Sequence, residues 1–110
     1  MDPAGEPDLT EAMDRLWARF LPQMRERVAT LETVAAAVAA GHLSIEERQA
    51  ACSAAHKLAG VLGAFGLAGG TVLARELEII YSRENGPGSA HAVRLIEIAA
   101  ELRAMVENRK

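Results

Sequence analysis

The sequence is poor in cysteine and has no long uninterrupted hydrophobic run. Cys52 is the single cysteine among 110 residues, so an internal disulfide is impossible and a reducing compartment is expected. No apolar stretch reaches the roughly 18 residues that a membrane-spanning helix needs. The acidic, proline-containing start, MDPAGEPD, does not resemble a signal peptide. We therefore expect a cytoplasmic domain with no membrane association.

Aromatic residues and clustered basic residues are also scarce. Only 4% of the residues are aromatic, and no stretch alternates β-branched with polar residues as a strand would. Lysine and arginine number 12 against 15 acidic residues, the net charge is −3, and no basic stripe is present, which argues against nucleic-acid binding. Alanine is abundant instead, and it is the best helix former. The composition predicts an all-α fold.

Apolar residues recur at alternating steps of four and three in the first half of the chain, which is the spacing of a helix packed in a bundle. These positions are Trp17, Leu21, Met24, Val28, Leu31, Ala35 and Val38. Pro22 lies within the series without shifting its phase, so it either begins a second helix or kinks a continuous one. Gly41 is expected to cap the carboxyl end of this helix.

A single domain of this length is expected over residues 8–110, preceded by a short disordered lead at residues 1–7. Asp8 and Glu11 have the spacing of a capping box and are expected to start the first helix.

Three further helices are predicted. Ser44 and Glu47 form a second capping-box pattern, which opens a helix that runs to about Phe65. A third helix is expected over residues 71–84, and the turn sequence Asn-Gly-Pro-Gly at 85–88 separates it from the last one.

The connections between these helices are short. Gly66, Gly69 and Gly70 are expected to form the loop before the third helix, and Ser89 is expected to cap the last helix. Because short loops make sequence neighbours antiparallel, we predict an up-and-down four-helix bundle with an N-terminal helical extension. We expect it to be a monomer.

His56 lies on the outer face of the second predicted helix. At about 100° per residue, Ala51, Ala54, Val61, Leu62 and Phe65 gather around Leu58 and form the buried stripe. His56 falls near the centre of the opposite face, about 160° away, and Cys52 and Ala59 lie on the flank. The residues that share the outer face with His56 are Gln49, Ser53, Gly60 and Gly63.

Gly60 and Gly63 lie in the interior of the predicted helix, where each glycine destabilises the helix by about 1 kcal/mol relative to alanine. Both are placed away from the predicted core, so close packing is a weak explanation for them. A helical side chain leans over the turn that precedes it, so a side chain at 60 would cover the ring of His56. Gly60 would therefore leave the imidazole open to a partner protein.

An exposed imidazole suits phosphoryl transfer. Histidine titrates near neutral pH, so a large fraction of it is uncharged and nucleophilic in the cell. Phosphoryl transfer needs positioning and charge neutralisation more than covalent assistance. A carrier can therefore consist of the histidine, free space and a nearby cation such as Lys57, while the partner supplies the aspartate and the metal ion.

The segment AHKLAGVLGAFGL at residues 55–67 resembles the histidine-phosphotransfer (Hpt) family. The matching positions are His56, Leu58, Gly60 and Gly66, and Leu77-Glu78 is similar to the family's Leu-Glu in the next helix. The resemblance implies a phosphorelay carrier of two-component systems. It would exchange a phosphoryl group on His56 with an aspartate of a receiver domain, or accept one from a histidine kinase, without independent catalysis and without a cofactor.

One position departs from the family. A lysine is common three residues after the histidine, where this chain has Ala59. Lys57, directly after His56, is the nearest cation in the sequence but is offset from that position on the helix. The residues expected around the phosphoryl group or against a docked partner are Lys57, Ala59, Gly60, Gly63, Ser53 and Gln49.

Other interpretations remain open. Because Ala59 replaces the usual lysine, the chain could instead be a helical module that docks on receivers and never carries phosphate. The dimerisation domain of a histidine kinase is disfavoured, because it would have an acidic residue where Lys57 follows His56. Cys52 beside His56 lacks the further ligands of a zinc site and the orienting carboxylate of a thiol enzyme. No metal is therefore expected.

Several remaining polar and aromatic residues are interpreted as structural. We interpret His42 and His91 as surface residues and Trp17 and Phe20 as core residues. The glutamates expected on a solvated helix face are Glu76, Glu78 and Glu84.

Overall fold

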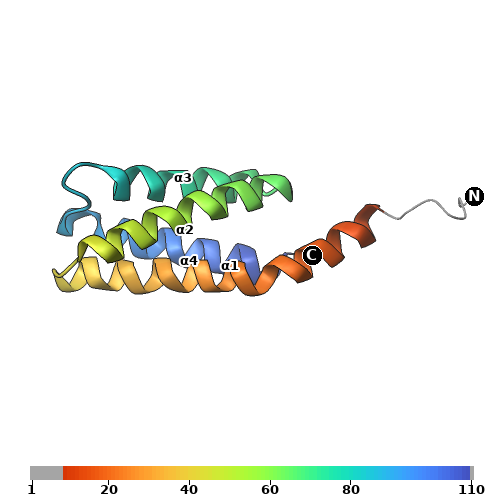
Figure 1. Ribbon diagram of the computed structural model, residues 1–110, viewed down its shortest axis with the longest axis horizontal. Helices are drawn as coiled ribbons and strands as arrows, with labels where there is room; N and C mark the ends of the chain where they lie inside the picture. The colour runs from red at the N-terminus through yellow and green to blue at the C-terminus, as the bar shows by residue number, and fades with distance from the viewer. Residues whose placement is uncertain (1–8, 110) are drawn as a thin grey trace, which may run out of the picture.

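A computed structural model describes residues 9–109, so the predicted lead at 1–7 and the Asp8 cap lie outside the described residues. The described chain forms four α-helices, one short 3-10 helix and no strand, as the sequence predicts (Figure 1). The elements are α1 (Leu9–Ala40), α2 (Ile45–Ala64), α3 (Ala68–Ser82), η1 (Ser89–His91) and α4 (Ala92–Asn108). None of these helices is both long and apolar enough to cross a membrane.

The long first helix is continuous through Pro22, which resolves the alternative left open by the sequence. Pro22 is exposed, so the backbone hydrogen bond that it removes lies on the solvent side of the helix. The helix ends at Ala40, and the next residue, Gly41, has a φ of +81°, which favours glycine. The amides of Gly41 and His42 donate to the carbonyls of Val38 and Ala37, at 3.1 and 3.0 Å, and so satisfy the end of the helix.

The capping box of α2 forms as predicted. The amide of Glu47 donates to Ser44 Oγ at 3.0 Å, and the amide of Ser44 donates to Glu47 Oε1 at 2.9 Å. The helix ends before Gly66, which has a φ of +77°. The amide of Leu67 then donates to the carbonyl of Leu62 at 2.8 Å.

The third helix begins earlier than the sequence predicts. Gly69 and Gly70 lie within α3, so their assignment to a loop is wrong. Gly70 is buried, and a Cβ atom there would stand 2.8 Å from Leu62 Cδ1 and 3.1 Å from Met105 Sδ. Glycine at this position thus allows α3 to pack closely against α2 and α4.

The start of the last helix also differs from the prediction. Ser89 does not cap it, because a 3-10 turn precedes α4 and no side-chain cap hydrogen bond forms. The amide of Gly88 instead donates to Nδ1 of His91 at 3.1 Å. His91 is therefore a half-buried part of this connection and not a free surface residue.

The helices pack antiparallel around one apolar core, with α2 lying against α1 and α3, and α4 against α1 and α3 (Figure 1). The predicted seam of the first helix is buried apart from Leu21, which is half-buried. The largest fully buried side chains are Tyr81, Met24, Leu31, Leu58, Leu62, Leu77, Leu95, Ile98, Leu102, Val28 and Val106.

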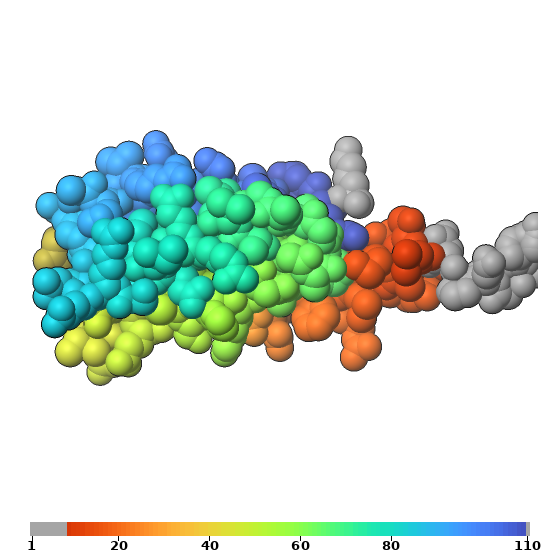
Figure 2. All heavy atoms as spheres, turned by 90° about the horizontal axis from the view of Figure 1, so that it is seen from above, coloured from red at the N-terminus to blue at the C-terminus, as the bar shows by residue number. Residues whose placement is uncertain are grey.

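The amino-terminal part of α1 projects beyond the other helices (Figure 2). Trp17 is buried, with its ring centroid 5.0 Å from that of Phe65. Phe20, which was expected in the core, is 39% exposed, and Phe65 is only half-buried. Both lie where the bundle ends and the extension begins, so no further helix covers them. Leu9 and Leu16 of the extension are exposed as well.

Candidate functional site

His56 lies in the middle of α2 and faces solvent. Its side chain is 69% exposed, whereas Leu58 and Leu62 on the same helix are fully buried. The outward orientation predicted from the helical periodicity is therefore correct. The imidazole is held by a rigid helix and is open to another protein.

Glu78 of α3 contacts this imidazole directly. Its Oε2 lies 2.8 Å from Nδ1 of His56, and its side chain is 28% exposed. The expectation of a fully solvated glutamate is therefore wrong for Glu78. Only the relative register of α2 and α3 brings these two residues together, so the sequence signal was limited to the Leu77-Glu78 resemblance.

The contact fixes the roles of the two ring nitrogens. A carboxylate only accepts hydrogen bonds, so the neutral imidazole that satisfies Glu78 carries its proton on Nδ1. Nε2 of His56 then keeps its lone pair on the side of the ring away from Glu78. An imidazole in this tautomer presents a nucleophilic nitrogen outward, and its carboxylate partner stabilises positive charge that develops on the ring.

The two glycines of the outer face differ in their surroundings. A Cβ atom on Gly60 would meet nothing within 4 Å, so the space beside His56 is open as predicted. A Cβ atom on Gly63 would stand 3.2 Å from Thr71 Oγ1 of α3. Gly63 therefore allows the two helices to approach each other, and packing explains it better than access to His56 does.

Ala59 is buried, with 2% of its surface exposed, so its side chain contributes nothing to an exposed docking face. The hydroxyl of Thr71 donates to its carbonyl at 2.9 Å. Ala59 was expected on the flank of α2 within the docking and phosphate environment, but its burial removes its side chain from the exposed face. The physical reason is that α2 packs against both α1 and α3, so its buried arc is wider than a single stripe centred on Leu58.

The remaining predicted residues are exposed around His56. Gln49, Ser53 and Lys57 all reach the surface of α2. Ser53 and Lys57 also line a shallow groove between α1 and α2, which Arg27 of α1 helps to form. Neither Lys57 nor Arg27 makes a hydrogen bond or an ion pair among the described residues, so both cations are free to meet a partner.

The model of the Hpt domain family matches residues 15–110, which is nearly the whole chain. The chain belongs to the Hpt domain family. Members of this family carry phosphoryl groups on histidine in two-component signalling and interact with histidine kinases and receiver domains. No curated protein gives a significant match. No solved structure does so either.

Cys52 lies one turn before His56 in this Hpt domain, but it is not placed to react. Its Sγ points to the carbonyl of Glu78, at 3.8 Å, and burial together with the charge of Glu78 raises the pKa of its thiol. A thiol with a raised pKa is a poor nucleophile at neutral pH. Among residues 9–109, no three His, Cys, Asp or Glu side chains cluster as metal ligands would.

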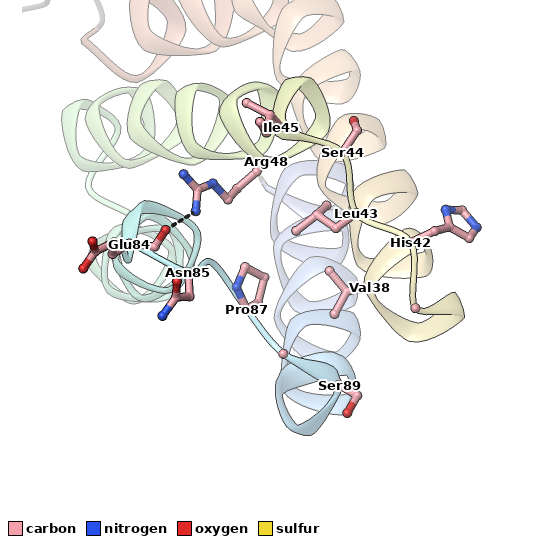
Figure 3. A pocket seen from close by; sticks show the side chains of 12 residues that line it. Val38, His42, Leu43, Ser44, Ile45, Arg48, Glu84, Asn85, Pro87 and Ser89 are labelled. Atoms are coloured by element: carbon pink, nitrogen blue, oxygen red, sulfur yellow. Dashed lines mark hydrogen bonds between the residues drawn. The ribbon is translucent and has the colours of Figure 1, made fainter.

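A surface pocket of the Hpt domain lies at one end of the bundle, between the α1–α2 and α3–α4 connections (Figure 3). Arg48 reaches across it and donates to the carbonyls of Arg83 and Glu84 at 2.9 and 3.0 Å. His42 points away from the cavity, as expected of a surface residue. Arg48 ties the first turn of α2 to the α3–α4 connection, and His56 lies two turns further along α2.

Proposed function

We propose that His56 is the phosphoacceptor of this Hpt domain and exchanges its phosphoryl group with an aspartate of a receiver domain. The observation that carries the proposal is the contact between Nδ1 of His56 and Glu78, which leaves Nε2 as the outward nucleophile. The chain would act as a carrier, and the transfer would be catalysed together with the partner receiver or kinase. Such a carrier belongs in the cytoplasm with its receivers.

The proposed transfer moves a phosphoryl group from the aspartate of the receiver to Nε2 of His56. The lone pair of Nε2 attacks the phosphorus of the aspartyl phosphate, a P–N bond forms, and the P–O bond to the aspartate breaks. The electron pair of that bond returns to the aspartate as carboxylate. The phosphorylated ring keeps its proton on Nδ1 and becomes cationic, and the carboxylate of Glu78 stabilises this charge. The reverse sequence donates the group to the next receiver.

The surface around His56 would accept the receiver. Gly60 leaves space over the ring on one side, and Ser53 and Gln49 continue the exposed face along α2. Because Lys57 and Arg27 beside the α1–α2 groove make no ion pair within the described chain, they would meet acidic groups near the receiver's phosphorylated aspartate.

A second candidate is a docking module that binds receivers without carrying phosphate. The alanine at position 59 favours it, because the helix position usually occupied by a lysine offers no cation to the phosphoryl group. The experiment must therefore detect phosphate on the protein as well as binding.

Mixing the protein with a phosphorylated receiver tests the proposal. Acid-labile, base-stable phosphate should appear on the wild-type chain and on the His42→Gln and His91→Gln variants. It should be absent from His56→Gln, which should still bind the receiver. A wild-type chain that binds the receiver but stays unphosphorylated would establish the docking module instead.

A further inference from the structure

A phosphoryl group on Nε2 of His56 would add negative charge at a place that already holds a carboxylate. Glu78 lies 2.8 Å from the other ring nitrogen, and the buried Ala59 supplies no cation. Stabilising a bound phosphoryl group requires charge neutralisation. A positive side chain must therefore come from elsewhere in the chain or from the partner.

Most arginines of the bundle are already engaged. Arg25, Arg94, Arg103 and Arg109 form ion pairs with carboxylates. Arg48 donates to backbone carbonyls. By contrast, Arg75 of α3 is exposed and makes neither an ion pair nor a hydrogen bond among residues 9–109.

Two contacts fix the place of Arg75 relative to His56. Glu78 contacts His56, and Thr71 contacts the carbonyl of Ala59. Arg75 lies between Thr71 and Glu78 and shares their side of α3, since residues three and four apart on a helix are neighbours. Because α2 and α3 run antiparallel, Arg75 stands beside the turn that joins His56 to Gly60.

The space needed by an arginine side chain is present at that turn. Gly60 has no side chain, and the position of its missing Cβ is open for 4 Å. A helical side chain leans toward the amino-terminal end of its own helix, which for Arg75 is the direction of Gly60. A guanidinium lying over Gly60 is about one helical turn from His56, within reach of a phosphoryl group on its ring.

On the basis of the function proposed above, we propose that Arg75 binds the phosphoryl group on His56 and replaces the cation that α2 lacks. Its planar guanidinium donates in parallel to two phosphoryl oxygens, a geometry that a lysine ammonium cannot offer. Gly60 would then serve both partner access and the placement of this arginine. Lys57 is offset from His56 by about 100° on the helix and lines the groove toward α1, so it would bind the receiver and not the phosphoryl group.

The test phosphorylates the full chain with phosphoramidate, a small donor that needs no docked receiver. The ³¹P NMR signal of the phosphohistidine is then followed against pH. A nearby cation favours the dianionic phosphoryl group, so Arg75→Gln should raise the midpoint of this titration by about half a pH unit. Arg75→Lys should raise it less. Arg83→Gln, at the end of α3, should leave it unchanged.

Lys57→Gln separates the two candidate cations in the same experiment. A shift for Arg75→Gln that exceeds the shift for Lys57→Gln supports the proposal, and one that is equal or smaller overturns it. Failure of the proposed function would look different, because the wild-type chain would then stay unphosphorylated when it is mixed with a phosphorylated receiver. Helical circular dichroism of each variant confirms that the exposed substitutions leave the bundle intact.

Discussion

The interface of α1 with α4 and the interface of α2 with α3 differ in the polar contacts that cross them. Across α1 and α4, Arg25 makes two bonds of 2.8 Å to Glu107, and Arg103 makes bonds of 2.7 and 3.1 Å to Glu32. These pairs hold their arginines in fixed, two-pronged geometries. They lie at the surface, so each adds little to stability, but the four charges in them are already paired within the bundle.

Across α2 and α3, the polar contacts are single hydrogen bonds and not two-pronged ion pairs. His56 meets Glu78, Thr71 meets the carbonyl of Ala59, and Gly60 leaves its surroundings empty. Arg75 of α3, which is close to this interface, makes no ion pair within the described chain, in contrast to Arg25 and Arg103 between α1 and α4. The difference is consistent with the function proposed above, in which His56 on the α2–α3 side exchanges a phosphoryl group with a partner.

The largest expected effect separates two glycines of these helices. Gly70→Leu should lower the free energy of unfolding by about 3 kcal/mol, because the new side chain would overlap Leu62 and Met105 in the core. Gly60→Leu should leave stability equal or slightly higher, since its surroundings are empty and leucine is the better helix former. It should nevertheless slow transfer from a receiver. Urea unfolding and a transfer assay measure both effects, and equal destabilisation by the two variants would refute the contrast.

The buried hydroxyl of Tyr81 gives the next largest effect. Burial raises the pKa of Tyr81 to about 12, and its hydroxyl has no hydrogen-bond partner in the described structure. In the unfolded chain the hydroxyl of Tyr81 ionises near pH 10. The contribution of this group to folding stability is therefore complete below pH 10 and is lost as pH rises toward 12.

The loss over that interval should amount to about 2 kcal/mol and should be absent from Tyr81→Phe. Tyr81 is the single tyrosine of the chain, so its absorbance near 295 nm reports its ionisation directly. An absorbance midpoint near pH 10 in the folded protein would show that the ring is not shielded.

A smaller effect is expected from the partner of the phosphoacceptor. Glu78→Ala should slow phosphorylation of His56 by about ten-fold, because the ring loses its fixed tautomer and its charge partner. Glu78→Gln should be milder, since an amide oxygen still accepts from Nδ1. Glu76→Gln is the matched control, because Glu76 lies on the same helix but pairs with Arg94 of α4. A Glu78→Ala rate equal to that of Glu76→Gln would remove the assigned role.

The smallest effect tests the interface of α1 with α4. Arg103→Gln should lower stability by about 0.5 kcal/mol and should not change phosphoryl transfer. The hydrogen bond from Arg103 lowers the pKa of Glu32. The stabilisation from this pair is therefore present at pH values above the usual pKa of a glutamate and is lost as the pH falls below it. Thermal unfolding at pH 7 and pH 3 should therefore show a difference between variant and wild type at pH 7 only.

Much of the fold could be predicted from the spacing of apolar residues. Four helices, the cap at Ser44 and the outward orientation of His56 all follow from local patterns, which a helix preserves in any environment. Gly70 was misread because a buried glycine and a loop glycine have the same sequence signal. Only the positions of Leu62 and Met105 reveal which of the two it is.

The candidate site could be predicted only in part. The side chain of His56 was found from its own helix, but the partnership with Glu78 depends on the register between α2 and α3, which local periodicity does not fix. Ala59 was misplaced for a similar reason, since its burial requires the second neighbour of α2. The contact with Glu78 and the burial of Ala59 both depend on how the helices pack together, which the periodicity of one helix does not determine.

The most direct test of the account asks which nitrogen carries the phosphoryl group. Protein phosphorylated by its receiver is digested in base, and NMR distinguishes a phosphoryl group on Nε2 from one on Nδ1. Because Nδ1 of His56 faces Glu78 at 2.8 Å, the account predicts that the phosphoryl group is bound to Nε2 of this residue. Phosphate on Nδ1, or on any residue other than His56, would contradict it.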